Sequence, residues 1–237
     1  MESRTDDRDP ARAERTIAAL LSSMSLEQKV SHLLMPEDRG YGPDDWRRLM
    51  NEVPLANAFV QTRDPRRMEE NIAAIQARAD RPVLVAADME NGYTGGTLFP
   101  RSMALGAAED RELAREKGRA LGRECRASGI HWCFNPVVDL PHDFRNPETC
   151  TRAYSDVPEV VAGFAVGQIA GMQEDTRVAA TAKHYPGAGT DDRGQHLCTS
   201  MNRLSLESWW ESFGHVWRAV IGSGVMAVMT GHIGLPS

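Results

Sequence analysis

Apolar positions along this chain follow two periods, one typical of helices and one typical of short buried strands. Helical spacing predicts helices at residues 11–24, 43–53, 64–79, 109–128, 158–174 and 205–223. A further helix is expected to follow Ser25, because Gln28 stands three residues later and completes a capping box. Short apolar runs predict strands at residues 56–61, 83–87, 130–138, 178–183 and 225–233, and a first strand or the approach to one at residues 33–35.

The order of these elements predicts an α/β fold. Strands and helices alternate, and most connections are too long for hairpins, so we expect parallel strands joined by helical crossovers. Polar residues stand where the strands end, and a parallel barrel gathers such ends on one face. We therefore expect Asp88, Lys183 and His232 to share one face. The neighbouring parallel strands that would carry them are expected at residues 83–88, 130–139, 178–183 and 225–231.

Two parallel architectures remain to be compared, a closed barrel and a doubly wound sheet. A doubly wound sheet would gather polar strand ends only at its switch point, and the sequence has neither a glycine-rich dinucleotide fingerprint nor a phosphate loop. We predict a (β/α)8-type TIM barrel, truncated here to about six βα units. Residues 1–237 are then one domain, incomplete at its C-terminus, with residues 1–10 disordered.

Composition narrows the classes of partner. The net charge is -6 and the pI about 5.7, so no basic face for nucleic acid or an anionic membrane is expected. The charged amino terminus is not a signal peptide, and no apolar run approaches the length of a membrane span. The four cysteines form no Cys-x-x-Cys pair. We expect reduced cysteines and a cytoplasmic protein.

The stretch from Val178 to His196 holds the densest candidate chemistry. An apolar run ends in Lys183 and His184, and a Pro/Gly loop with further charges follows. A strand that fixes the backbone before such a loop is typical of α/β active sites. The chain has three lysines against many arginines, which favours a specific need for a compact ammonium at residue 183. An ordinary strand-end lysine is the alternative.

Four motifs in order resemble one known family. Val83–Gly92, Asn135–Asp139, Arg152–Ser155 and Lys183–Gly189 together resemble the N-terminal catalytic barrel of glycoside hydrolase family 3. The likeness is strongest to the β-N-acetylhexosaminidase branch and spans roughly residues 20–235. It implies hydrolysis of β-glycosidic bonds, as a β-N-acetylhexosaminidase or a β-glucosidase-like enzyme, with no metal or organic cofactor. It also implies a carbohydrate substrate.

The resemblance assigns sugar-binding roles at the strand ends. Asp88 would accept hydrogen bonds from sugar hydroxyls, and Arg152, Lys183 and His184 would also hold the sugar in one pocket. His232, at the end of the last predicted strand, is a further candidate. A carboxylate beside cations stays ionised, which suits such recognition. The alternatives are a strand-end cap for Asp88 and a hydrogen-bonded core histidine for His184.

The resemblance also implies a histidine as general acid/base, polarised by an Asp two residues earlier. His196 stands where that histidine is expected, and imidazole titrates near neutrality. Gly194 occupies the place of the Asp, so Asp191 or Asp192 would have to fold back toward His196, with Asp192 the candidate orienter. A surface histidine is the alternative. Ala188 also replaces a His of the usual turn.

The nucleophile of the family is an Asp after strand seven, and this chain is expected to stop after strand six. Three interpretations stay open. The chain is an enzyme or part of one, a non-catalytic carbohydrate-binding or regulatory relative, or a half-barrel that needs a complementing chain. Retention needs a nucleophile and an acid/base about 5 Å apart. We therefore expect the 237-residue chain alone not to hydrolyse glycosides.

Overall fold

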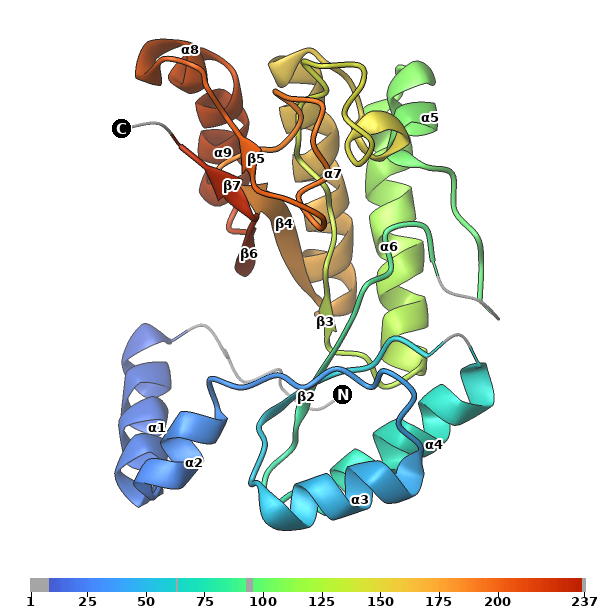
Figure 1. Cartoon of the computed structure of the whole chain (residues 1–237). Coiled ribbons are helices and arrows are strands. Elements are labelled where there is room, and N and C mark those ends of the chain that lie inside the picture. Colours follow the sequence, from blue (N-terminus) through green and yellow to red (C-terminus); the bar gives the residue numbers. More distant parts are fainter. Residues whose placement is uncertain (1–8, 63, 93–95, 236–237) are drawn as a thin grey trace.

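The computed structural model describes residues 9–62, 64–92 and 96–235. Its centre is a parallel sheet in the order β1-β2-β3-β4-β6. The bounds of these strands are Asn57–Phe59 (β1), Leu84–Ala87 (β2), Trp132–Cys133 (β3), Ala179–Tyr185 (β4) and Ala227–Thr230 (β6). The α/β fold and the four neighbouring parallel strands predicted from the sequence are confirmed, as a curled half-barrel (Figure 1). The predicted disorder of residues 1–10 falls largely on residues 1–8, outside the described residues.

Helices connect the strands, as crossovers between parallel strands require. The capping box predicted at Ser25 is confirmed, since Gln28 N donates to Ser25 Oγ at 3.2 Å and Ser25 N donates to Gln28 Oε1 at 3.0 Å. The helix bounds are Pro10–Ser23 (α1), Leu26–Ser31 (α2), Pro43–Glu52 (α3), Pro65–Gln76 (α4), Ser102–Ala107 (α5), Arg111–Ala127 (α6), Pro158–Thr176 (α7), Leu206–Glu211 (α8) and Phe213–Gly222 (α9), with a 3₁₀ turn at Cys150–Arg152.

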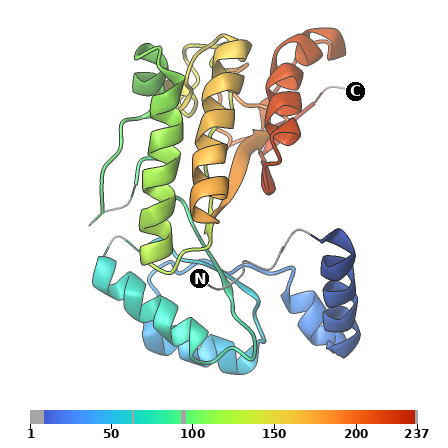
Figure 2. The ribbon, with the colours of Figure 1, turned by 180° about the vertical axis from the view of Figure 1, so that it is seen from behind.

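Three helices, α6, α7 and α9, stand in a row behind the sheet (Figures 1 and 2). Small residues set the distance between α6 and α7. A Cβ on Gly118 would lie 2.3 Å from the carbonyl oxygen of Gln168, and one on Gly171 would lie 2.1 Å from that of Arg115. The two backbones therefore touch, and the core fills the space between this helical layer and the strands. It includes Leu121, Cys125, Phe164, Ile169, Val178, Ala180 and Val216.

Residues 33–35 are the approach to a first pairing and do not form a strand themselves. Leu33 lies in a turn, Leu33 and Leu34 are both exposed, and the chain first pairs with β1 slightly later. Phe59 N donates to the carbonyl oxygen of Pro36 at 2.9 Å, and Asp38 N donates to that of Phe59 at 3.0 Å. An apolar run of three residues before a proline could not locate that pairing.

Other predicted elements are shorter than the sequence suggested. Within 130–138, only Trp132–Cys133 form a strand, with an isolated bridge from Val137 to Lys183. Pro136 offers no N–H to the sheet, so pairing is interrupted there. The helix predicted over 205–223 breaks at Ser212, which lies outside helical geometry. The last strand ends at Thr230, and Ile233–Gly234 (β7) pair instead with Ser200–Met201 (β5).

Candidate active site

Asp88 and Lys183 meet at the carboxyl ends of β2 and β4. Lys183 Nζ lies 2.9 Å from Asp88 Oδ1. The Lys183 side chain is 2% exposed, whereas that of Asp88 is 32% exposed. A flexible four-carbon stem lets the ammonium reach this edge from a buried strand position. The open acceptor of the pair is therefore Asp88.

Glu90 joins this pair to Arg152. Its Oε1 lies 2.7 Å from Lys183 Nζ, and Arg152 binds both of its oxygens, through Nη2 at 2.5 Å and Nε at 2.9 Å. Burial by itself would raise the pKa of Glu90, but the hydrogen bond from Arg152 and the charges of Lys183 and Arg152 outweigh it and lower the pKa to about 2. We call Asp88, Glu90, Arg152 and Lys183 the strand-end cluster.

His184 is held by Asp139, which follows β3. Asp139 is buried and accepts three hydrogen bonds, from His184 Nδ1 at 2.7 Å, from His184 N at 3.2 Å and from Ala188 N at 2.8 Å. The imidazole of His184, which follows Lys183 directly in the sequence, is therefore held through one ring nitrogen. The position fits the hydrogen-bonded core histidine weighed above, and a sugar contact by His184 stays a prediction.

The loop that leaves β4 is fixed by aromatic residues of α8 and α9. Trp209 Nε1 and Trp217 Nε1 both donate to the carbonyl oxygen of Pro186, at 3.0 and 3.2 Å. Gly187 has a φ of +129°, and a Cβ there would lie 2.0 Å from Phe213 Cδ1, so only glycine fits. The Lys183–His184 and Tyr185–Pro186 peptide bonds are cis. The Pro/Gly run seen in the sequence is thus a packed turn.

The next loop folds on its own carboxylate, Asp191. Asp191 accepts from Ser200 Oγ at 2.6 Å and from Met201 N at 2.7 Å. Asn146 of the preceding long loop donates from Nδ2 to the carbonyl oxygens of Asp191 (2.8 Å) and Arg193 (3.2 Å). Asp191 therefore stabilises the loop, and the two loops are tied together.

The structure does not bring the predicted orienter to His196. Asp192 is exposed, and within the described part of the chain the ion pair of His196 is with Glu148, whose Oε2 lies 3.8 Å from its Nε2. The prediction for Asp192 failed because an exposed loop residue has no packing that would turn it inward. His196 itself is 68% exposed.

His232 follows β6, as expected, and is exposed. Its backbone N donates to Gln195 Oε1 at 3.0 Å, which ties the end of β6 to the loop that carries His196. A role of the His232 side chain in sugar binding stays a prediction.

Three carboxylates at this edge received no site role from the sequence. Two of them carried a signal, since Asp139 directly follows a predicted strand and Glu90 forms a carboxylate pair with Asp88 after another. Glu148 carried none, because it meets His196 through the packing of two loops that are distant in sequence. The described site therefore holds four carboxylates that contact cationic or imidazole groups: Asp88, Glu90, Asp139 and Glu148.

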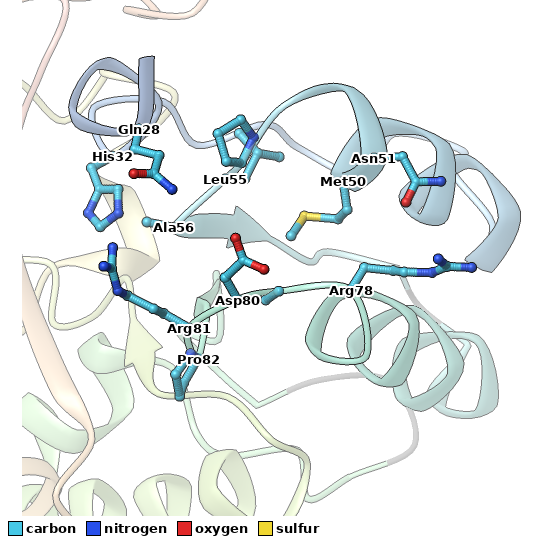
Figure 3. A pocket seen from close by; sticks show the side chains of 12 residues that line it. Gln28, His32, Met50, Asn51, Leu55, Ala56, Arg78, Asp80, Arg81 and Pro82 are labelled. Atoms are coloured by element: carbon cyan, nitrogen blue, oxygen red, sulfur yellow. The ribbon is translucent and has the colours of Figure 1, made fainter. Parts of the chain in front are cut away.

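A cavity of about 320 Å³ lies at the other edge of the sheet (Figure 3). Its walls come from the segments that precede β1 and β2, and from α2. It therefore opens at the amino ends of the strands, away from the strand-end cluster. In parallel barrels, conserved chemistry lies at the carboxyl ends, so we do not assign this cavity to the candidate site.

Fold and site together define a barrel protein of the class whose active sites lie at the carboxyl ends of parallel strands. Residues 25–237 match the model of the glycosyl hydrolase family 3 N-terminal domain. The chain belongs to this family. The family resemblance predicted from the four sequence motifs is thereby confirmed.

The chain is similar to curated proteins that are named β-N-acetylglucosaminidase/β-glucosidase or β-hexosaminidase. The chain is 34% identical over 225 residues to a β-N-acetylglucosaminidase/β-glucosidase of Cellulomonas fimi, covering 93% of this chain and 40% of that protein. It is 35% identical over 176 residues to a β-hexosaminidase of Xylella fastidiosa strain M12, covering 70% of this chain and 52% of that protein. The chain thus spans about half the length, or less, of these relatives.

Solved structures also resemble this chain over most of its length. A family 3 β-N-acetylglucosaminidase from Paenibacillus sp. str. FPU-7 superposes with a TM-score of 0.83 at 32% identity, over 90% of this chain and 43% of that one. The β-glucoside phosphorylase BglX bound to 2FGlc gives a TM-score of 0.85 at 29% identity, over 94% and 41%. The truncated barrel predicted from the sequence agrees with these neighbours. No helix in the described ranges is long and apolar enough to cross a membrane.

Proposed function

We propose that this chain is the sugar-binding part of a retaining β-glycosidase that acts on N-acetyl-β-glucosaminides. The observation that carries the proposal is the strand-end cluster, in which two cations and two carboxylates meet at the carboxyl ends of β2 and β4. Sugar hydroxyls need both donors and acceptors, and charged partners give the stronger hydrogen bonds. Relatives named as β-N-acetylglucosaminidase and β-hexosaminidase support the choice of sugar.

In the proposed mechanism, His196 donates a proton to the glycosidic oxygen as the leaving group departs, and then takes a proton from the water that hydrolyses the covalent glycosyl intermediate. The exposed Asp88 carboxylate accepts hydrogen bonds from the sugar, while Lys183 and Glu90 fix its position. The nucleophile would be an Asp beyond the strands described here. The longer chains of the relatives leave room for it. We propose accordingly that the 237-residue chain alone does not turn over glycosides.

A second candidate is a carbohydrate-binding relative without catalysis. Two observations favour it: Gly194 supplies no carboxylate to His196, and the His196 ring is largely exposed. The two candidates share the sugar-binding cluster and differ only in turnover.

A cytoplasmic location is also proposed, because the four cysteines Cys125, Cys133, Cys150 and Cys198 are free.

The test is turnover of a chromogenic N-acetyl-β-glucosaminide by a form of the protein that continues beyond Ser237 to the length of its relatives. We expect turnover in water, reduced at least about 100-fold by Asp88→Ala or His196→Ala, since removing a positioning or proton-transfer group typically costs factors of this order. Inorganic phosphate is varied in parallel, because one solved relative is a phosphorylase.

Asp192→Ala is the matched control, because Asp192 is an exposed carboxylate of the same loop. Binding of the sugar without turnover would favour the non-catalytic candidate. Turnover by the 237-residue chain itself, abolished by His196→Ala, would contradict the proposed place of the nucleophile. Unchanged turnover and unchanged sugar affinity in Asp88→Ala would contradict the site.

A further inference from the structure

Glu148 reaches His196 from a separate loop. It lies between β3 and α7, whereas His196 lies between β4 and β5. Its Oε1 accepts a hydrogen bond from the backbone N of His196 at 3.2 Å, and its Oε2 lies 3.8 Å from His196 Nε2. The carboxylate is 15% exposed. Its Oε2 is buried and has no hydrogen-bond partner among the described residues, so it is available to the ring.

The backbone of Glu148 is held at both ends. Its N donates to Asn146 Oδ1 at 3.0 Å, and its carbonyl oxygen accepts from Arg152 Nη1 at 3.3 Å. Asn146 also ties this loop to the loop of His196, through the carbonyl oxygens of Asp191 and Arg193. Glu148 is therefore held in place and contacts both Arg152 of the strand-end cluster and His196, the candidate proton-transfer residue.

The glycine at position 194 complements Glu148. A Cβ on Gly194 would lie 2.9 Å from Glu148 Oε1 and 3.6 Å from Pro147 Cγ. A side chain at position 194 and the Glu148 carboxylate would thus compete for one space. Gly194 leaves that space free, and Glu148 fills it with an acid group beside the imidazole.

We propose that Glu148 is the positioning residue for His196, supplying from the β3–α7 loop the carboxylate that position 194 lacks. This inference rests on the proposed role of His196 in the proposed function. A carboxylate that holds one ring nitrogen fixes the orientation of the imidazole and leaves the other nitrogen to transfer a proton. At 3.8 Å the contact is too long for a hydrogen bond, as is common in unliganded sites that tighten around substrate.

The test measures the order of the His196 ring in the 237-residue chain, without substrate. The ¹³Cδ2–H order parameter is obtained by NMR relaxation at about pH 5, where imidazole carries its proton. Glu148→Gln keeps the shape of the side chain and an oxygen for the backbone N of His196, and removes only the charge. We expect the order parameter to fall by roughly 0.2, the difference between rigid and flexible groups.

Asp192→Asn is the matched control and should leave the ring order unchanged. The swap Glu148→Ala/Gly194→Asp moves the carboxylate to position 194 and should restore the order, which a purely structural role of Glu148 would not produce. Ring order unaffected by Glu148→Gln, or lowered as much by Asp192→Asn, would overturn the inference. Because no turnover is measured, this result is independent of whether the protein hydrolyses glycosides.

Discussion

The strand-end cluster and the Glu148–His196 pair place similar charges in different settings. In the cluster, Lys183 is 2% exposed and its contacts to carboxylates are 2.7 and 2.9 Å long. In the pair, His196 is 68% exposed and 3.8 Å from its carboxylate. Parallel strands bring the first set together directly, whereas two packed loops bring the second.

This difference agrees with the two proposed roles, sugar binding by the cluster and proton transfer by His196. A buried, hydrogen-bonded cluster is pre-organised, because its side chains lose little freedom when a ligand arrives. The exposed imidazole of His196 is held less tightly, by a single carboxylate at 3.8 Å. We infer that the cluster contributes strongly to the stability of the fold, and that the loop pair contributes little.

Removing the central charge of the cluster is expected to have the largest effect. Glu90→Gln leaves Lys183 and Arg152 buried with one carboxylate fewer, and breaking a buried ion pair on one side costs about 3–5 kcal/mol. The free energy of unfolding, measured by urea denaturation at pH 7, should fall by this amount. Glu116→Gln, an exposed carboxylate on α6, is the control. An equal change in the free energy of unfolding in both variants would contradict the claim that the strand-end cluster stabilises the fold strongly.

Lowering the pH should remove the contribution of the Glu90 charge to the free energy of unfolding. Because the pKa of Glu90 is lowered from 4.5 to about 2, its stabilisation is fully present above about pH 4.5 and is lost as the pH falls toward 2. A lowering of this size corresponds to about 3 kcal/mol. The difference in unfolding free energy between wild type and Glu90→Gln should shrink by this amount over that range. A difference that stays constant with pH would contradict the charge account.

Asp139→Asn tests the carboxylate that holds His184 at the same edge. The amide keeps one acceptor oxygen but turns donors toward His184 and Ala188, so one or two buried N–H groups lose their partner. Each such loss costs about 1–3 kcal/mol. The unfolding free energy should fall accordingly, with Asp192→Asn as the exposed control. A cost no larger than that of the control would show that His184 is not fixed by Asp139.

The smallest effect is expected at His196. His196→Ala removes an exposed ring, and surface substitutions of this kind change the free energy of unfolding by less than about 0.5 kcal/mol. The same variant should abolish turnover in a complete form, so stability and activity separate at this residue. A loss of stability comparable to that of Glu90→Gln would place His196 among the structural residues instead.

The strand-end residues were predictable because one rule located them. Short apolar runs gave the strands, parallel order brought their carboxyl ends together, and Asp88 and Lys183 are in contact as a result. Arg152, which lies on a long loop, received its role only through the family resemblance. Glu90 forms a carboxylate pair with Asp88 in the sequence. The alternation of side chains along a strand does not predict which of two such nearby carboxylates turns inward.

The loop residues were not predictable in the same way. Proximity in sequence favoured Asp192 as the partner of His196, and the fold supplied Glu148 from 48 residues away. Asp191, the other candidate, accepts hydrogen bonds from Ser200 and Met201 of the following strand, β5. Loop–loop packing depends on contacts such as those of Asn146, which leave no periodic signal in the sequence.

The central claim is that the strand-end cluster binds the sugar, and its most direct test is calorimetric titration of the 237-residue chain with N-acetylglucosamine. Asp88→Asn keeps the shape of the side chain and removes its charge, while Lys183 retains Glu90 at 2.7 Å. We expect Kd to rise at least about tenfold, since a hydrogen bond to a charged group contributes about 1.5–3 kcal/mol, and Asp192→Asn to leave Kd unchanged. The same Kd in wild type and Asp88→Asn, or no binding by the wild-type chain, would contradict the account.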